Sequence, residues 1–239
     1  TPYLDFLCGA GTLLLGHNHP AIQEAIAGVA NPLMNHLDLR TSSESDFVQT
    51  LLPRLPFKDK SDIRVHFCGP TGGDSIEAAL KLAAIKTGRK GIFAFHGGYH
   101  GMSQGALSVT SNNSLRAAGL NVTRDVTFVP YPYPYRFPEG FQTEESATDF
   151  CLAQLRLMLE DDHSGTGVPG AMLIEPIQGE GGTVVAPKRF IQELRKICDE
   201  FGIVLIFDEI QAGLGRCGHW FCADYYDVQP DIIAISKGI

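Results

Sequence analysis

The sequence predicts an α/β domain built on a mainly parallel sheet, and two observations indicate this fold. First, short runs of β-branched, aromatic and other apolar residues recur along the chain, and several are almost continuously apolar, which is typical of strands buried on both faces. Second, helical patterns lie between these runs, and strands that alternate with helices form parallel sheets through right-handed crossovers. The predicted strands cover residues 63–68, 91–95, 126–130, 171–175, 203–208 and 232–236.

The predicted helices of this domain cover residues 75–87, 146–160 and 187–201, whereas the N-terminal residues show a different pattern. Asn18 and Pro20 can open a helix toward Gly28, because asparagine caps helices and proline fits their first turn. A second helix is predicted to begin at residues 42–45 and to end at Pro53 or Pro56. The sequence therefore predicts a helical arm over residues 1–58 and an α/β domain over residues 59–239.

Composition excludes several classes of function. The chain has 239 residues, of which 44% are hydrophobic, so a sizeable core is available. Its 19 basic and 27 acidic residues give a net charge of −8 without any Lys/Arg block, which argues against nucleic-acid binding and against an anionic membrane surface. No apolar run approaches the roughly 20 residues that cross a bilayer. The six cysteines include no C-x-x-C pair and predict free thiols of a cytoplasmic protein, and no metal site is predicted.

Residues 68–77 (Cys-Gly-Pro-Thr-Gly-Gly-Asp-Ser-Ile-Glu) predict a glycine-rich turn between a strand and a helix, with Asp74 or Ser75 as the N-cap. The first N–H groups of a helix have no partner within it and lie at its positive end, so this turn suits a phosphate group. The turn matches neither a Walker loop nor the G-x-G-x-x-G fingerprint of dinucleotide sites. The alternative is an ordinary strand-to-helix turn with a capped helix.

Two further chemical groups follow predicted strands. Asp208 and Glu209 end a buried strand, where open α/β sheets place their ligands, although Asp208 could equally cap a helix. Lys237 follows the last strand; such a lysine commonly reaches solvent, but beside a phosphate site and a buried carboxylate it can form an imine with an aldehyde. Pyridoxal 5'-phosphate uses this combination of a phosphate cradle, a carboxylate against the pyridine nitrogen and an amine.

The order and spacing of these segments resemble the class III (ω-type) aminotransferases, which are pyridoxal-phosphate enzymes of fold type I. The resemblance runs from Leu4-Asp5-Phe6 to Ser236-Lys237. Its motifs are residues 16–20 (Gly-His-Asn-His-Pro), 69–77, 97–101 (Gly-Gly-Tyr-His-Gly), 175–182, 208–218 and 231–237. It implies a fold-type I large domain, a mainly parallel sheet flanked by helices, with an N-terminal helical arm and with the C-terminal small domain outside this chain.

The resemblance also implies the roles of individual residues. Lys237 is expected to bind the cofactor as an imine and to shuttle the substrate proton, and Asp208 to pair with the pyridine nitrogen. Gln211 is expected to hydrogen-bond the phenolic oxygen of the cofactor, and Tyr99 to stack on its ring. The other expected positions are Gly72 and Gly73 as N–H donors to the phosphate, Thr71 as a hydroxyl donor to it, and Glu180 and Ala10 on the substrate side.

Three neighbouring residues are expected to support the site. His100 is expected to hold its loop more than to transfer protons, and Glu175 and Arg216 to satisfy backbone groups. The chain also departs from the family, because Thr71-Gly72-Gly73-Asp74 replaces Ser-Gly-Thr/Ser-Glu, so one side-chain donor to the phosphate is expected to be missing. The family's cross-subunit threonine and carboxylate-binding arginine are expected after Ile239, in a homodimer or a dimer of dimers.

The expected activity is transfer of a terminal amino group from a small-molecule donor to a 2-oxo acid. Within the family, residues 9–13, 69–72 and 100–107 most resemble the subgroup that converts 2,4-diaminobutyrate and 2-oxoglutarate into aspartate 4-semialdehyde and glutamate. Met102 stands where ornithine and acetylornithine relatives carry an arginine, and Glu180 suits a donor with two ammonium groups. The alternatives are an ornithine or 4-aminobutyrate aminotransferase, an aminomutase or decarboxylase of the same cofactor family, and a non-catalytic module, which the retained Lys237 and Asp208 disfavour.

Overall fold

The structure is a computed structural model that describes residues 2–29, 39–117, 119 and 125–239. The chain divides into two compact units, one formed by Thr1–His66 with Lys237–Ile239 and the other by Phe67–Ser236. The sequence predicts a division between residues 58 and 59, and that assignment of domains stays a prediction.

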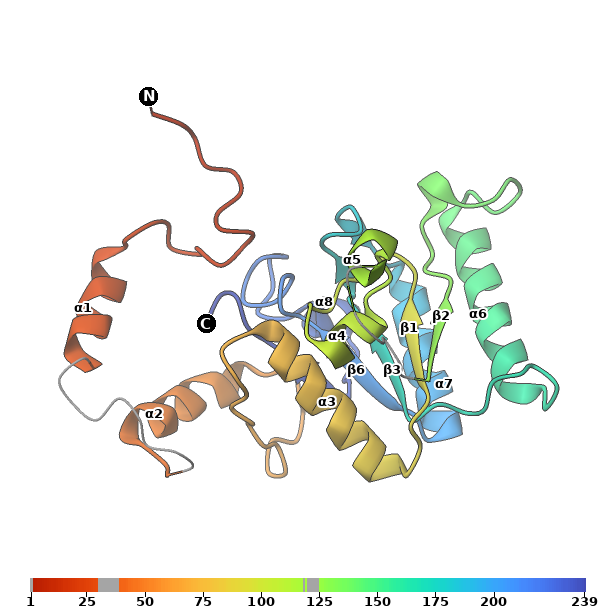
Figure 1. Cartoon of the computed structure of the whole chain (residues 1–239), viewed down its shortest axis with the longest axis horizontal. Helices are drawn as coiled ribbons and strands as arrows, with labels where there is room; N and C mark the ends of the chain where they lie inside the picture. The colour runs from red at the N-terminus through yellow and green to blue at the C-terminus, as the bar shows by residue number, and fades with distance from the viewer. Residues whose placement is uncertain (1, 30–38, 118, 120–124) are drawn as a thin grey trace. The chain divides into compact units, whose positions relative to one another are not determined.

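The first unit contains the two helices that the sequence predicts (Figure 1). α1 spans Pro20–Val29 and begins on the proline itself. α2 spans Ser42–Leu51, and its N-cap Thr41 forms a reciprocal pair with Glu44: the Thr41 hydroxyl accepts the Glu44 N–H, and the Glu44 carboxylate accepts the Thr41 N–H at 3.0 Å. The short 3-10 helix η1 (Leu52–Arg54), which contains Pro53, follows, so the α-helix ends at Leu51, two residues before the nearer of the two predicted ends.

A five-stranded sheet forms the centre of the second unit. Its strands lie in the order β2 (Val126–Val129), β1 (Ile92–Phe95), β3 (Ala171–Ile174), β6 (Val204–Asp208) and β7 (Ile232–Ala234). Every neighbouring pair is parallel, and the register places Asp208 opposite Ala234. The α/β prediction is therefore confirmed. A separate antiparallel pair, β4 (Ile177–Gln178) and β5 (Val184–Val185), follows β3 and was not predicted.

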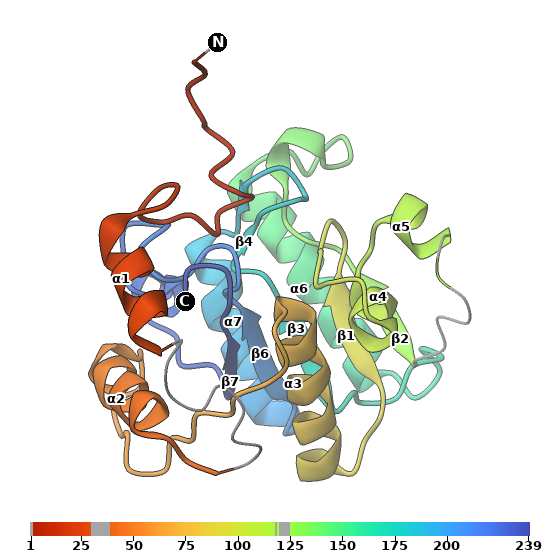
Figure 2. The ribbon, with the colours of Figure 1, turned by 60° about the vertical axis from the view of Figure 1, so that its left-hand side comes forward.

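Helices cover both faces of the five-stranded sheet (Figures 1 and 2). α3 (Gly72–Thr87) and α4 (Gln104–Val109) cover one face, where their apolar side chains pack on Ala94, Leu173 and Ile206. α6 (Glu144–Glu160) and α7 (Lys188–Phe201) cover the other, where the ring centroids of Phe95 and Phe190 are 5.9 Å apart. The remaining short helices are α5 (Asn113–Ala117), η2 (Pro134–Arg136) and α8 (Cys222–Tyr226).

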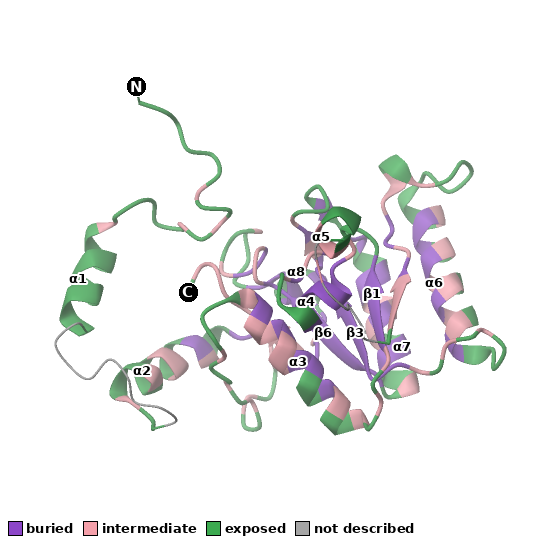
Figure 3. Cartoon of the chain, viewed as in Figure 1, coloured by how far each residue is buried: buried purple, intermediate pink, exposed green. Residues whose placement is uncertain are grey.

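Alternate residues of each central strand face opposite layers, which explains why these strands are apolar throughout. Figure 3 shows the resulting core, with β1, β3 and β6 buried along their length. None of the helices in the described part of the chain is long and apolar enough to cross a membrane.

Two sequence predictions are corrected by the structure. Residues 63–68, expected to form a strand, form none, and none of the described strands pairs with them. The prediction was wrong because β-branched and aromatic residues favour a strand only where a sheet surface packs against them, and the side chains of this segment are exposed or half-buried. The helix expected at residues 75–87 begins at Gly72 with Thr71 as N-cap, so neither Asp74 nor Ser75 caps it.

Candidate active site

The functional side chains of the second unit gather at the carboxyl edge of the sheet. The strand order reverses between β1 and β3, since β2 lies on one side of β1 and β3 on the other. Ligands of open α/β sheets bind at this switch point, beyond the carboxyl ends of the strands. Tyr99 and His100 follow β1, Glu175 follows β3, and Asp208 ends β6, so the sequence positions them at that edge.

The N-terminus of α3 is fixed by a capping box. The Thr71 hydroxyl accepts the Asp74 N–H at 3.4 Å and donates to Asp74 Oδ2 at 2.8 Å, and the same oxygen accepts the Thr71 N–H at 3.0 Å. Gly72 and Gly73 are the first two residues of the helix, so their N–H groups have no acceptor within it. This geometry makes the helix start a ready anion site.

The helix start is enclosed by two other turns that leave no room for side chains. A Cβ on Gly72 would lie 2.8 Å from Cδ1 of Ile210, and a Cβ on Gly101 would lie 2.9 Å from Cα of Gly73. Gly101 also has a φ of +126°, which favours glycine. The turn after β1 and the turn after β6 therefore both approach the N-terminus of α3, and the sequence needs glycine at each approach.

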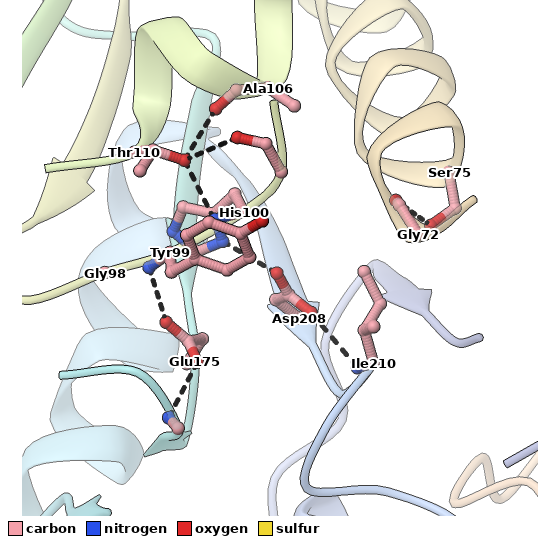
Figure 4. Close-up of polar contacts among 12 residues, drawn as sticks. Gly72, Ser75, Gly98, Tyr99, His100, Ala106, Thr110, Glu175, Asp208 and Ile210 are labelled. Atoms are coloured by element: carbon pink, nitrogen blue, oxygen red, sulfur yellow. Dashed lines mark hydrogen bonds and ion pairs between the residues drawn. The ribbon is translucent and has the colours of Figure 1, made fainter. Parts of the chain in front are cut away.

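A buried histidine and a buried aspartate form the centre of the site (Figure 4). His100 Nδ1 lies 2.7 Å from Asp208 Oδ2, and the two side chains are 1% and 3% exposed. The other carboxylate oxygen, Oδ1, accepts the Ile210 N–H at 3.1 Å. The His100 N–H donates to the Thr110 hydroxyl at 3.0 Å, which in turn donates to backbone carbonyls. The histidine is thus held from its backbone while its ring orients the aspartate.

Glu175 links the loops that follow β1 and β3. Its Oε1 accepts the Tyr99 N–H at 2.8 Å, and its Oε2 accepts the Gly179 N–H at 2.9 Å. This agrees with the expectation that Glu175 satisfies backbone groups. Tyr99 is half-buried, and the hydrogen bond from its N–H to Glu175 fixes the position of its backbone.

Burial and charge act together on these titratable groups. Burial alone lowers the pKa of His100, but the hydrogen bond and charge of Asp208, together with the charge of Glu175, outweigh it, so the pKa of His100 is raised. Burial raises the pKa of Glu175, with the charge of His100 acting in the opposite direction. The charge of His100 and the charges of Asp208 and Glu175 therefore act on one another inside the buried site.

The turn after β6 carries two more residues of the site. Glu209 is buried and accepts the N–H groups of Cys222 and Ala223 at 2.6 and 3.0 Å, so it caps the N-terminus of α8. Gln211 lies so close to Gly179 that a Cβ there would stand 1.2 Å from Gln211 Oε1. The amide of Gln211 therefore occupies the space that only a glycine at 179 leaves open.

The first unit brings together two of the sequence-predicted residues. Lys237 Nζ donates to the carbonyl of Ala10 at 2.8 Å, and both residues have a positive φ, +31° and +55°. Two residues separate Lys237 from the end of β7.

The whole chain matches one family. A sequence model of the aminotransferase class-III family covers residues 1–239. The chain belongs to this family. It is 46% identical over 99% of its length to the diaminobutyrate–2-oxoglutarate aminotransferase of Haemophilus influenzae and 40% identical over 99% to that of Rhizobium meliloti, of which it covers 52% and 51%. It thus spans about half the length of the curated relatives it matches.

Solved structures of this fold agree. The taurine:2-oxoglutarate aminotransferase of Bifidobacterium kashiwanohense, solved with PLP (pyridoxal 5'-phosphate) and glutamate, superposes with a TM-score of 0.87 at 28% identity over 99% of this chain and 52% of that one. The (S)-enantioselective ω-transaminase of Thermomicrobium roseum gives 0.87 at 29% identity over 99% of this chain and 53% of that one. The fold-type I assignment of this class-III chain is therefore confirmed.

The sequence missed three partnerships within this class-III site. Glu77 holds the start of α4 by accepting the Ser103 hydroxyl at 2.9 Å and the Gly105 N–H at 2.6 Å. Glu209 caps α8, and His100 pairs with Asp208. The available signal was similar in each case: a single charged or titratable residue in a glycine-rich turn or in the helix that follows one. This signal does not show which distant residue the side chain contacts.

Proposed function

We propose that this chain is the cofactor-binding part of a pyridoxal-phosphate-dependent transaminase, which moves the terminal amino group of 2,4-diaminobutyrate to 2-oxoglutarate. The observation that carries the proposal is the buried His100–Asp208 pair near the N-terminus of α3, whose first N–H groups have no acceptor within the helix, at the switch point of a class-III fold. Aspartate 4-semialdehyde and glutamate are then the products.

The residues present fit the cofactor. The N–H groups of Gly72 and Gly73 suit the phosphate, and the helix start carries no side chain of its own there, since a Cβ on Gly72 would meet the Ile210 side chain. Asp208 suits the pyridine nitrogen, because the negative charge of a buried carboxylate favours the protonated form of that nitrogen. The Thr71 hydroxyl donates to Asp74, so a direct bond from it to the phosphate requires that hydrogen to rotate.

Pyridoxal phosphate, when bound, supplies an electron-accepting ring that stabilises negative charge on the substrate carbon. We assign the other tasks to side chains of this chain: Lys237 Nζ holds the cofactor and moves the proton of the substrate, and Asp208 holds a proton on the ring nitrogen. Gln211 donates to the phenolic oxygen, and Tyr99 packs on the ring. His100 orients the Asp208 carboxylate through its Nδ1.

The proposed donor follows from the relatives and from the substrate side. The relatives of highest identity named above are diaminobutyrate–2-oxoglutarate aminotransferases. Met102 is 49% exposed, so it is not buried beneath its loop, and it offers no charge to a substrate carboxylate. We place Glu180 and Ala10 on the substrate side. Glu180 is exposed in the turn between β4 and β5, and the carbonyl of Ala10 accepts a hydrogen bond from the Lys237 amine.

The reaction is tested with the full-length protein, 2-oxoglutarate and each of three donors: 2,4-diaminobutyrate, ornithine and 4-aminobutyrate. Formation of glutamate distinguishes a transaminase from an aminomutase or a decarboxylase of the same cofactor family. We expect kcat/KM to be highest for 2,4-diaminobutyrate. A preference of about tenfold or more for another donor, about 1.4 kcal/mol in transition-state binding, would reject the proposed substrate.

The assignment of Lys237 has a separate test. Borohydride reduction of the holoenzyme should attach the cofactor to the peptide that contains Lys237, and Lys237→Ala should remove this label while the protein stays folded. Lys196, which is paired with Glu193 on the surface of α7, provides the control: Lys196→Ala should leave the label in place. Labelling of another lysine in the Lys237→Ala protein would show that the assignment is wrong.

Assembly and compartment are the last part of the proposal. We infer a cytoplasmic homodimer or dimer of dimers, on the resemblance to the family. The six cysteines form no disulfide in the structure, which agrees with a reducing compartment. The exposed apolar side chains of the first unit, which include Tyr3, Leu4 and Phe6 at 89%, 86% and 90%, agree with burial in an assembly. Multi-angle light scattering of the full-length protein measures the number of subunits.

A further inference from the structure

Two cysteines of the turn after β6 lie in contact. The Sγ atoms of Cys217 and Cys222 are 3.4 Å apart, and both cysteines are free thiols in the structure. Cys222 is fully buried as the first residue of α8, whereas Cys217 is partly exposed. The sequence shows no pairing among the six cysteines, because only the folded turn brings these two together.

The turn that separates them is held by its backbone. The Leu214 N–H donates to the Trp220 carbonyl at 2.7 Å, and the Gly215 N–H donates to the His219 carbonyl at 3.1 Å. These bonds hold Cys217 close to Cys222. A disulfide needs the two sulfurs to approach from 3.4 Å to about 2.05 Å, and side-chain rotation with a small shift of the turn can supply this movement.

The same turn connects the thiols to the proposed active site. The Cys222 thiol donates to the Ala212 carbonyl at 3.7 Å, and Ala212 is the neighbour of Gln211. The Cys222 N–H donates to Glu209, the neighbour of Asp208. Cys222 is thus bonded to both residues that adjoin the proposed cofactor contacts of this turn.

We propose that Cys217 and Cys222 form a reversible disulfide, and that its formation weakens the hold of this turn on the cofactor. The inference rests on the proposed function for its consequence, but the disulfide itself is detectable without any activity.

The oxidation is a thiol–disulfide exchange with a small-molecule disulfide such as oxidised glutathione. The accessible Cys217 loses its proton to solvent and attacks one sulfur of that disulfide, which releases one thiol and leaves a mixed disulfide on Cys217. Cys222 then attacks the Cys217 sulfur and releases the second thiol. The protein loses two electrons and two protons, and the small disulfide gains them as two thiols.

Glu209 is placed to accept the second proton. Burial, followed by the charge of Glu209, raises the pKa of Cys222, so this thiol needs a nearby base to react. Glu209 interacts with the Cys222 thiol, and burial raises the pKa of Glu209 to about 7, so this carboxyl can hold a proton near neutral pH.

The consequence follows from the bond that oxidation removes. Once the Cys222 sulfur carries no hydrogen, it can no longer donate to the Ala212 carbonyl, and the bond to Cys217 draws the turn toward α8. The backbone beside Gln211 then loses the hydrogen bond that holds Ala212 to α8. We expect the Kd for pyridoxal phosphate to rise about tenfold, the order of change that one lost hydrogen bond produces.

The test uses the full-length protein, reduced with dithiothreitol or exposed to oxidised glutathione, and digested with trypsin after the free thiols are blocked. Cleavage after Arg216 and Lys237 gives a peptide that contains these two cysteines alone. After oxidation this peptide should carry no blocking group, and its mass should be two hydrogen atoms below that of the unblocked dithiol peptide. Oxidation should also raise the Kd for pyridoxal phosphate, and dithiothreitol should reverse both changes. Cys217→Ser should abolish both, and Cys8→Ser, which alters a partly exposed cysteine of the other unit, should abolish neither.

Each result decides the proposal. No disulfide in that peptide, or a disulfide that leaves the Kd unchanged, would overturn it. Cys222→Ser is not required for this conclusion, so a folding defect at the buried position does not affect the test. A reduced protein that binds no pyridoxal phosphate would instead overturn the proposed function, and the mass of the peptide would still report on the disulfide.

Discussion

Replacement of His100 by leucine tests whether the buried pair stabilises the second unit. Asp208 has two hydrogen-bond partners among the described residues, His100 Nδ1 at 2.7 Å and the Ile210 N–H at 3.1 Å. Leucine fills much of the same volume but cannot donate. The His100→Leu protein therefore keeps a buried carboxylate with one backbone bond.

The expected cost follows from the loss of one partner of a buried pair. Removal of one member of a buried ion pair costs about 3–5 kcal/mol, because the remaining charge stays desolvated. We therefore expect the free energy of unfolding to fall by about 3–5 kcal/mol at pH 7.

Urea unfolding of the apoprotein, followed by circular dichroism, measures this difference without any contribution from a cofactor. His163→Leu is the matched control, because the His163 side chain is 95% exposed and lies in the same unit. We expect that control to change the free energy of unfolding by no more than about 0.5 kcal/mol. If His100→Leu costs no more than His163→Leu, the His100–Asp208 bond does not stabilise the fold and the reasoning is refuted.

Three further predictions follow from neighbouring contacts. Burial raises the pKa of Glu209 to about 7, so between about pH 5 and 7 the folded protein holds a proton that the unfolded chain has lost. The free energy of unfolding should therefore fall by up to about 1.36 kcal/mol for each unit that the pH rises in this range. Glu209→Gln should remove this dependence on pH. Gly179→Ala should displace the Gln211 amide and reduce kcat/KM as much as Gln211→Ala does, and the double variant should lose nothing more; separate, additive losses would contradict this. Asp208→Asn should reduce kcat far more than it weakens cofactor affinity, since its role grows in the transition state; near-normal kcat with weak retention would show that Asp208 only anchors.

The sequence predicted most of the fold because the strands and helices have local signals. β1, β3 and β6 are short apolar runs between helices, and α7 buries Phe190, Ile191 and Leu194 from one face. The start of α3 was less accurately predicted. Both Asp74 and Ser75 are good capping residues, and the choice of Thr71 depends on the reciprocal bond between Thr71 and Asp74.

The partners within the candidate site could not be predicted from the sequence. Asp208 was singled out because it ends a buried strand, but its partner His100 precedes it by 108 residues. Tyr99 and Glu175, which share a hydrogen bond, are 76 residues apart. No periodicity or local motif records such a distance; only the packing order of β1, β3 and β6 brings the three turns to one edge.

The roles of the glycines could be predicted from the sequence only in part. In the sequence they indicate tight turns, and Gly101 with its positive φ fits that interpretation. Gly72 and Gly179 do not, because neither has a positive φ, and each instead makes room for a side chain of the turn after β6, Ile210 and Gln211 respectively. The backbone at Gly72 and Gly179 must therefore stay bare so that this one turn can reach both the start of α3 and the loop after β3. The geometry of the site thus depends on the absence of side chains at these positions as much as on the presence of Asp208 and His100.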